Sequence, residues 1–171
     1  MRRADRIKLL LLMSLFAAPA LAAWVVHQVW RPGVDGSYGE LLPPIQPRFA
    51  GQAADLASLR GRWVLLTVVN GDCGLDCRQQ LHLAHQVRIA QGREQARVAQ
   101  ALIQSDNGVP AGQVNLLNYR VPAASLADWP DPLRTYLVDP LGRVMLRFPV
   151  APEGKGMLRD LRQLLKASKI G

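Results

Sequence analysis

The fold is decided by the stretch Trp63-Val-Leu-Leu-Thr-Val-Val-Asn-Gly-Asp-Cys-Gly-Leu-Asp-Cys77. Its first seven residues are apolar or β-branched almost without interruption, which is typical of a central strand covered on both faces. Asn70 and Gly71 then signal a turn, and residues 75–94 have the pattern of a long helix with one apolar face. The sequence therefore predicts a buried strand that passes into a helix at two cysteines.

The elements after this stretch predict an α/β domain. The patterns indicate strands over 97–103, 135–138 and 143–148, a short helix around 114–118, and a final amphipathic helix over 156–166. A βαβ unit followed by ββα is the thioredoxin arrangement, so we expect a thioredoxin-like α/β fold with a central mixed sheet over residues 61–171. Residues 31–60 are interrupted by prolines and glycines and are predicted to be a linker.

The N-terminal segment has the character of a membrane anchor. Residues 9–26 contain no charged side chain, and the flank 1–8 is basic. A spanning helix needs roughly 20 apolar residues, so 9–30 is just long enough, and the basic flank predicts a cytoplasmic N-terminus. Ala20-Leu-Ala22 also fits a cleaved signal peptide, although the apolar run continues to Val26. We expect a single-pass anchor in a bacterial inner membrane, with the C-terminal domain in the periplasm.

The overall charge limits the classes of partner. The chain carries 21 Lys and Arg against 13 Asp and Glu. The bases are scattered and are not interleaved with aromatic side chains, so no nucleic-acid partner is expected. A simply solvated surface is the favoured interpretation of the surplus; if the surplus has a partner, an anionic membrane surface or an acidic partner is the better interpretation.

Cys73 and Cys77 are the only cysteines. On the predicted helix they lie at i and i+4, with Cα atoms about 6 Å apart, a distance that a disulfide can span. A five-residue loop gains little stability from a disulfide, so the spacing indicates redox or metal chemistry, with an idle local disulfide as the alternative. A helix N-terminus favours the thiolate. Cys73 is predicted to attack and Cys77 to resolve, because Cys73 precedes the helix.

Charged and metal-binding residues near the cysteines refine this hypothesis. Asp72 and Asp76 disfavour a further anion, and Arg78 offsets part of that effect. We therefore expect a less acidic thiol than in a strong oxidant, which favours a reductant or a metal carrier. Copper(I) prefers thiolates but usually takes a third ligand. His82 and His85 fall about 140° and 80° around the predicted helix from the second cysteine, so neither suits that role.

The sequence resembles a known family. Residues 61–77 resemble the Sco group of cytochrome c oxidase assembly factors, in which a strand is followed by Cys-x-x-x-Cys. Residues 135–142 are similar to the hairpin of that group, and residues 37–43 and 91–94 resemble a short, membrane-anchored variant. The resemblance extends over residues 37–168. It implies a thioredoxin fold and a cytochrome c oxidase subunit, or another assembly factor, as partner.

One position departs from the Sco pattern. Sco proteins that bind copper carry a histidine five residues before the hairpin aromatic; here Asp131 stands in that place, and no histidine follows His85. The adjacent Pro132 falls near the place where thioredoxins have a cis-proline facing the cysteines. The resemblance therefore implies an assembly factor that reduces client disulfides through Cys73 and Cys77. A copper(I) chaperone, with copper(I) bound by both cysteines, and a non-catalytic interaction scaffold are the alternatives.

Overall fold

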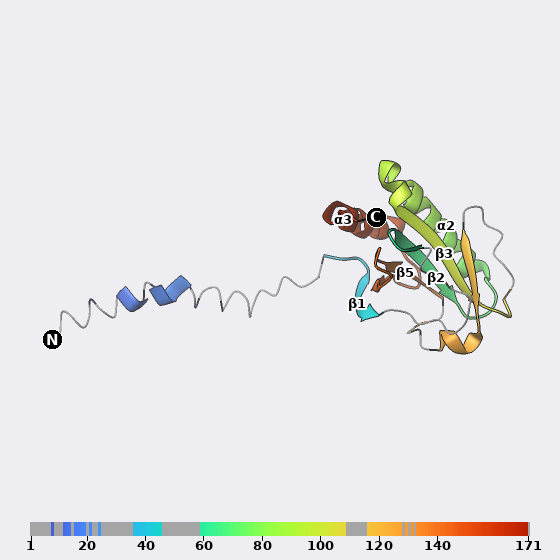
Figure 1. Ribbon diagram of the computed structural model, residues 1–171, viewed down its shortest axis with the longest axis horizontal. Helices are drawn as coiled ribbons and strands as arrows, with labels where there is room; N and C mark the ends of the chain where they lie inside the picture. The colour runs from blue at the N-terminus through green and yellow to red at the C-terminus, as the bar shows by residue number, and fades with distance from the viewer. Residues whose placement is uncertain are drawn as a thin grey trace. The chain divides into compact units, whose positions relative to one another are not determined.

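The computed structural model describes residues 36–45, 59–108, 116–127, 129, 131 and 133–170, and residues 8, 12–14, 16–19, 21 and 24 of the N-terminal segment (Figure 1). The described N-terminal residues are helical. Among all described residues, none of the helices combines the length and the apolar character needed to cross a membrane. Most of the predicted anchor over 9–30 lies outside the described residues. The chain divides into two compact units, residues 1–36 and 37–171.

The second unit is built on a six-stranded mixed sheet with the order β1-β6-β5-β2-β3-β4. The strands are β1 (Glu40–Ile45), β2 (Trp63–Val69), β3 (Val98–Ser105), β4 (Leu117–Val121), β5 (Arg134–Val138) and β6 (Val144–Arg147). β2, β3 and β4 are parallel to one another, whereas β5, β6 and β1 pair antiparallel on the other side of β2. The predicted central mixed sheet is confirmed.

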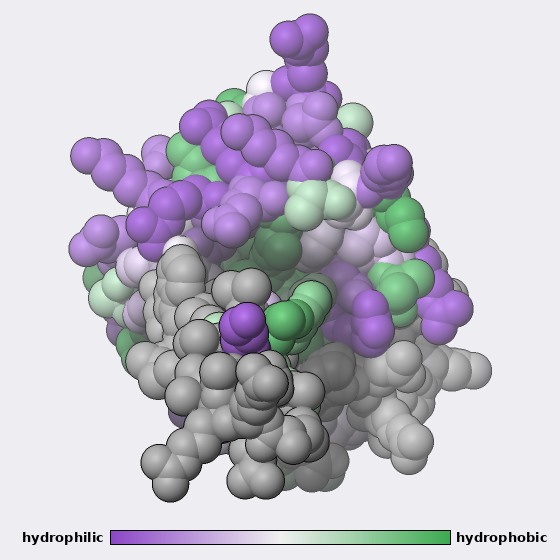
Figure 2. Space-filling view, turned by 90° about the vertical axis from the view of Figure 1, so that its left-hand side faces the viewer, coloured by the Kyte–Doolittle hydropathy of each residue, from purple (hydrophilic) through white to green (hydrophobic). Residues whose placement is uncertain are grey.

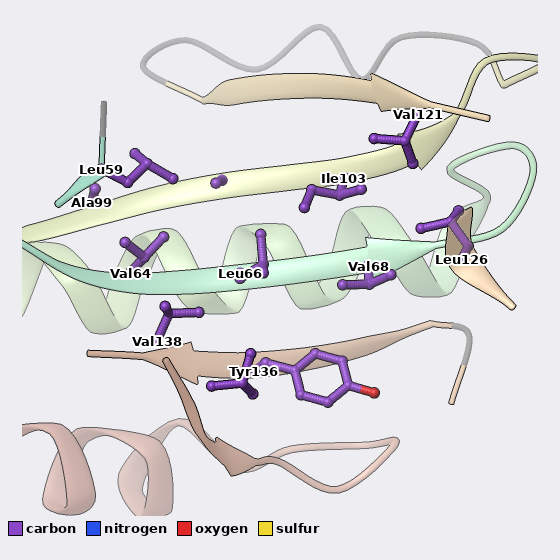
Figure 3. Packing of buried hydrophobic residues seen from close by; sticks show 12 residues of the cluster. Leu59, Val64, Leu66, Val68, Ala99, Ile103, Val121, Leu126, Tyr136 and Val138 are labelled. Atoms are coloured by element: carbon purple, nitrogen blue, oxygen red, sulfur yellow. The ribbon is translucent and has the colours of Figure 1, made fainter. Parts of the chain in front are cut away.

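Two helices, α2 (Leu75–Ile89) and α3 (Gly154–Ala167), pack on one face of the sheet. Their apolar side chains, such as Val87 and Leu161, join Leu65 of β2 in one core cluster. The opposite face of the same strands carries a second cluster, which Figure 3 shows with α2 behind the sheet; it includes Leu66 and Tyr136. All residues of β2 and β3 are buried, because apolar side chains cover both faces. Each fully buried Leu or Val contributes roughly 1.5–3 kcal/mol.

Two elements differ from the sequence-based expectation. The helix after the cysteines ends at Ile89, and a 3-10 helix, η2 (Gly92–Arg97), follows, because Gly92 takes a φ of +61° that interrupts the α-helix. The predicted short helix around 114–118 is wrong over residues 116–118, because residue 116 is not helical and β4 begins at Leu117; residues 114 and 115 lie outside the described part. Only the last of the five β4 residues is buried, so the strand has no apolar periodicity to reveal it.

The domain begins before residue 61, the boundary that the sequence indicates. β1 lies within the predicted linker over 31–60, and the second compact unit starts at Ser37. Pro43 and Pro44 suggested irregular structure. Proline is nevertheless tolerated in an edge strand, because one side of its backbone makes no hydrogen bonds to a neighbouring strand. The pairing of β1 with β6 is irregular over the segment that contains both prolines.

A buried carboxylate attaches the start of the domain to α3. Asp160 accepts hydrogen bonds from the backbone N–H of Tyr38 at 2.9 Å and of Gly39 at 2.8 Å. The Tyr38 ring lies against Gly156, where a Cβ would overlap the ring. The Tyr38 hydroxyl accepts the N–H of Glu153 at 2.7 Å, just before α3 begins. The residues that precede β1 are therefore anchored on a helix as well as on the sheet.

Candidate thiol-disulfide site

Cys73 and Cys77 form a disulfide, with Cα atoms 5.1 Å apart. Cys73 lies in the loop after β2, whereas Cys77 is in the first turn of α2, whose N-cap is Gly74. The cysteines therefore lie on either side of the helix N-terminus rather than on one helix face, which brings their Cα atoms closer than predicted. Both are buried, at 5% and 1% exposure. Because the exposures are so similar, the assignment of Cys73 as the attacking thiol rests on its position before the helix.

Apolar side chains from several elements surround the disulfide. The cysteines form a cluster with Val69 of β2, Leu81 of α2 and Leu102 of β3. Leu75, between the cysteines, is by contrast 82% exposed. The disulfide thus packs against buried apolar side chains, and the exposed side chain of Leu75 lies next to it in the sequence.

Leu133 is a site residue that sequence analysis missed. It packs against the cysteine cluster from the loop before β5. Its φ is +66°, and its N–H donates to the carbonyl of Val68 at 2.9 Å, which holds this loop beside the end of β2. The neighbouring Pro132 lies outside the described residues, so its predicted place facing the cysteines stays a prediction.

The charged residues predicted to flank the cysteines lie at the site. Asp72 and Asp76 are exposed, and Asp76 belongs to the first turn of α2. Arg78 donates from Nε to the carbonyl oxygen of Cys73 at 3.2 Å. Arg78 therefore connects the first turn of the helix to the main chain of the first cysteine.

Asp131 is bound by basic side chains of the sheet. Arg147 donates to its Oδ2 at 2.6 Å, and Nη2 of Arg134 lies 3.6 Å from the same oxygen. Arg147 also contacts Glu40 of β1 at 2.6 Å. The Tyr136 hydroxyl donates to the carbonyl of Asp131 at 3.1 Å, and burial raises the pKa of Tyr136, which keeps this donor protonated. Asp131 is thus part of an ion-pair network between β1, β6 and the loop before β5.

The donor set does not fit a three-ligand copper(I) site. In the part of the chain that the structure describes, no three His, Cys, Asp or Glu side chains come together as metal ligands would. His82 is exposed and hydrogen-bonded to Gln86 at 2.9 Å, and His85 is half-buried elsewhere on α2. Asp131, at the place of the Sco histidine, is engaged by Arg147. The thiolates of Cys73 and Cys77 are thus left without a third ligand from any described histidine or carboxylate.

A buried polar chain connects α2 to the sheet close to the cysteines, and sequence analysis missed it. Gln80 lies three residues after Cys77 and is buried. Its Oε1 accepts the hydroxyl of Thr135 at 3.1 Å, and its Nε2 donates to the carbonyl of Val150 at 2.8 Å. Thr67 pairs with Thr135 across β2 and β5 at 3.2 Å and must be the donor, because the Thr135 proton is used toward Gln80.

We expect Gln80→Met to lower the free energy of unfolding by about 1–3 kcal/mol, because it removes the acceptor of the buried Thr135 hydroxyl and the donor to the Val150 carbonyl. Denaturant unfolding followed by circular dichroism measures the change. Gln79→Met is the matched control, since Gln79 is exposed on the same helix and its replacement should matter by less than about 0.5 kcal/mol. Equal effects of the two substitutions would contradict the role given to Gln80.

The side chain of Gln104 contrasts with that of Gln80 in its hydrogen bonding. It is fully buried on β3, two residues after Leu102, and among the residues that the structure describes neither of its side-chain polar atoms has a hydrogen-bond partner. Its Nε2 lies near the loop that leads to Cys73: a Cβ on Gly108 would come within 3.0 Å of that atom and would also overlap the carbonyl of Gly71. A buried amide without partners lowers stability.

Gln104→Met is therefore expected to raise the free energy of unfolding by about 1–3 kcal/mol, the reverse of the same substitution at Gln80. The same denaturant titration measures it on the oxidised protein. A loss of stability would show that the amide has a partner in solution.

A family model described as "Transmembrane-like, thioredoxin-like, C-terminal domain" matches residues 63–168, which hold both cysteines and β2 to β6. The chain belongs to this family. The thioredoxin-like fold implied by the sequence resemblance is thereby confirmed. Comparison with curated proteins gives no match for this member of the family.

Solved structures share the fold at low identity. ScoI of Arabidopsis thaliana with copper bound has a TM-score of 0.51 and 14% identity, covering 77% of this chain and 100% of that one. The exposed lipoprotein thioredoxin Etrx1 of Streptococcus pneumoniae has 0.51 and 14%, covering 71% and 99%. ScoI of Bradyrhizobium japonicum with copper bound has 0.49 and 19%, covering 74% and 99%. At such identities the likeness to the first two structures concerns the fold alone, so function must be argued from the site.

Proposed function

We propose that this thioredoxin-like protein is a thiol-disulfide reductant that acts through Cys73 and Cys77. The observation that carries the proposal is the disulfide at the N-terminus of α2. It closes a loop of only five residues, so opening it costs the fold little, and the helix N-terminus stabilises a thiolate. The exposed carboxylates of Asp72 and Asp76 disfavour that thiolate, which suits a mild reductant better than a strong oxidant.

The reaction consists of two exchanges. The Cys73 thiolate attacks one sulfur of a client disulfide, which forms a mixed disulfide and releases the first client thiolate. The Cys77 thiolate then attacks Sγ of Cys73, which forms the disulfide seen in the structure and releases the second client thiolate. Two electrons and the two thiol protons pass to the client, and a dithiol donor must reduce the pair again.

The client that we propose is a cytochrome c oxidase subunit or another assembly factor. Support comes from the resemblance of residues 61–77 and 135–142 to the Sco group. Copper delivery is not proposed, because Asp131 stands in the place of the Sco histidine and is ion-paired with Arg147. A copper-site cysteine pair that has become oxidised would need such a reductant before it could take up metal.

We also propose that residues 9–30 anchor the protein in an inner membrane, with the redox domain in the periplasm. The uncharged run over 9–26 and the basic flank before it support this orientation, as does membership of a family described as transmembrane-like.

The test of the redox function is exchange with a client peptide. The reduced full chain in detergent is mixed with an oxidised peptide that carries the copper-site cysteine pair of the oxidase, and thiols are counted after acid quenching and alkylation. We expect the peptide to become reduced as the Cys73–Cys77 disulfide forms. A potential below about −300 mV, the range of structural disulfides, together with no exchange, would contradict the proposal.

Two further measurements separate the alternatives. Anaerobic titration with copper(I) is expected to show weak binding that an ordinary chelator outcompetes; tight one-to-one binding, lost when the cysteines become serine, would favour a copper chaperone. Normal oxidase assembly in a strain with the double Cys73→Ala/Cys77→Ala variant would favour an interaction scaffold.

A further inference from the structure

The exposed face of α3 carries a stripe of basic side chains. Its members are Lys155, Arg159, Arg162 and Lys166 on the helix and Lys169 just beyond it. The spacing of four, three and four residues places the helical members within about 60° of one another, along about 16 Å of the helix. All are exposed. Figure 2 looks onto the side of the domain where α3 lies in Figure 1, and hydrophilic side chains cover the upper part of that face.

The five bases of the stripe outnumber the two acids on or next to α3, which are the exposed N-cap residue Glu153 and Asp160. The acidic residue of α3, Asp160, is buried and accepts two backbone N–H groups; its Oδ1 is 3.9 Å from Arg159. Arg162 donates to the carbonyl of Ala90. Among the described residues no carboxylate forms an ion pair with Lys155 or Lys166. Like charges at these spacings destabilise a helix, and solvated surfaces usually mix the two signs, so the arrangement indicates an anionic partner.

The same helix holds the start of the domain. Asp160 binds the N–H groups of Tyr38 and Gly39, so the chain that precedes β1 leaves the domain beside α3. Six residues, 31–36, separate Ser37 from the end of the proposed membrane segment at residue 30. Fully extended, they span at most about 21 Å. If residues 9–30 lie in a bilayer, as proposed above, this length keeps α3 within reach of the headgroups.

We propose that the basic stripe of α3 docks on anionic phospholipid headgroups of the membrane that holds the N-terminal segment. The proposal rests on the anchoring for proximity and is independent of the redox chemistry. The apolar side of α3, which includes Met157 and Leu161, is buried in the domain core, so the contact is electrostatic and sensitive to salt. Each basic side chain near an anionic surface strengthens association about fivefold.

The experiment follows the reactivity of the lysines in the full chain. The protein is reconstituted into nanodiscs of phosphatidylcholine, alone or mixed with phosphatidylglycerol, and is treated with a water-soluble acylating reagent. Mass spectrometry then gives the acylation rates of Lys155 and Lys166. We expect both rates to fall about fivefold or more in the anionic discs, and to recover in high salt. Equal rates in the two lipids would overturn the proposal and would leave an acidic protein as the partner of the stripe.

Two double variants, each of which removes two positive charges, distinguish a specific role of the α3 stripe from a general effect of the net charge. Arg159→Gln/Arg162→Gln keeps both reporter lysines and should abolish most of the protection. Arg60→Gln/Arg120→Gln removes two exposed charges outside α3 and should preserve it. Loss of protection in both would overturn a role specific to α3.

Extraction with alkaline carbonate distinguishes failure of the anchoring from failure of the docking. If carbonate extracts the chain and the lysines are nevertheless protected by vesicles that contain phosphatidylglycerol, the anchoring is wrong and the docking stands. If the chain resists carbonate and the lysines react equally in both lipids, the anchoring stands and the docking is wrong.

Discussion

A Cys77→Ser variant is expected to accumulate as a mixed disulfide with its client, whereas Cys73→Ser is expected to form none. If Cys73 attacks first, the mixed disulfide can be resolved only by a thiol at position 77, four residues away across the start of α2. Serine is close to cysteine in size but does not attack a disulfide. Turnover in either variant should therefore fall to the rate of exchange without protein. Non-reducing electrophoresis and mass spectrometry of the trapped adduct measure the outcome.

Gln79→Ser is the matched control for this experiment, because it places a serine on the exposed side of α2 and leaves both cysteines in place. It should reduce the client peptide at the rate of the unaltered protein. Trapping by Cys73→Ser instead of Cys77→Ser would reverse the order of attack. Trapping by neither variant, together with no turnover in the unaltered protein, would count against the reductant function itself.

Asp160→Ala is expected to lower the free energy of unfolding by about 3–5 kcal/mol, the largest effect on stability among the substitutions considered. The carboxylate is 3% exposed and accepts two backbone N–H groups, those of Tyr38 and Gly39. A hydrogen bond to a charged group contributes about 1.5–3 kcal/mol, and removing the acceptor leaves both donors unpaired. Denaturant unfolding gives the free energy, and hydrogen exchange at residues 38 and 39 should accelerate in parallel.

Gln163→Ala provides the control, since Gln163 is exposed on the same helix and its loss should change stability by less than about 0.5 kcal/mol. An Asp160→Ala protein with an unchanged unfolding midpoint would mean that the attachment of the start of the domain to α3 adds nothing to stability.

The centre of the fold was predictable because its residues carry strong local signals. The run from Trp63 to Val69 is apolar or β-branched throughout and ends at a turn signal, and it forms the central β2 as expected. The two edge strands of the sheet, β1 and β4, carry no such local signal. β1 contains prolines, which an edge strand tolerates, and β4 has only one buried residue, Val121.

The site was predictable to a similar extent. The short spacing of Cys73 and Cys77 after a strand marked the pair, and the structure joins them. What supports the pair depends on contacts between residues distant in sequence, which periodicity does not show. Gln80 and Thr135 are 55 residues apart and meet only because α2 crosses β5. Leu133 reaches the cysteines through a loop conformation with positive φ that no residue type at that position announces.

The attachment of Tyr38 and Gly39 to Asp160 also determines how the domain would respond to a mechanical pull. Tension applied through the preceding chain reaches these two residues before it reaches β1. Their N–H groups bind the two oxygens of one carboxylate, so a pull must break these two hydrogen bonds before it loads β1. The applied force is thus transmitted to α3, and the hydrogen bonds between β1 and β6 carry less of it. A domain on a tether would in this way keep its sheet and its cysteine pair undisturbed while the tether moves.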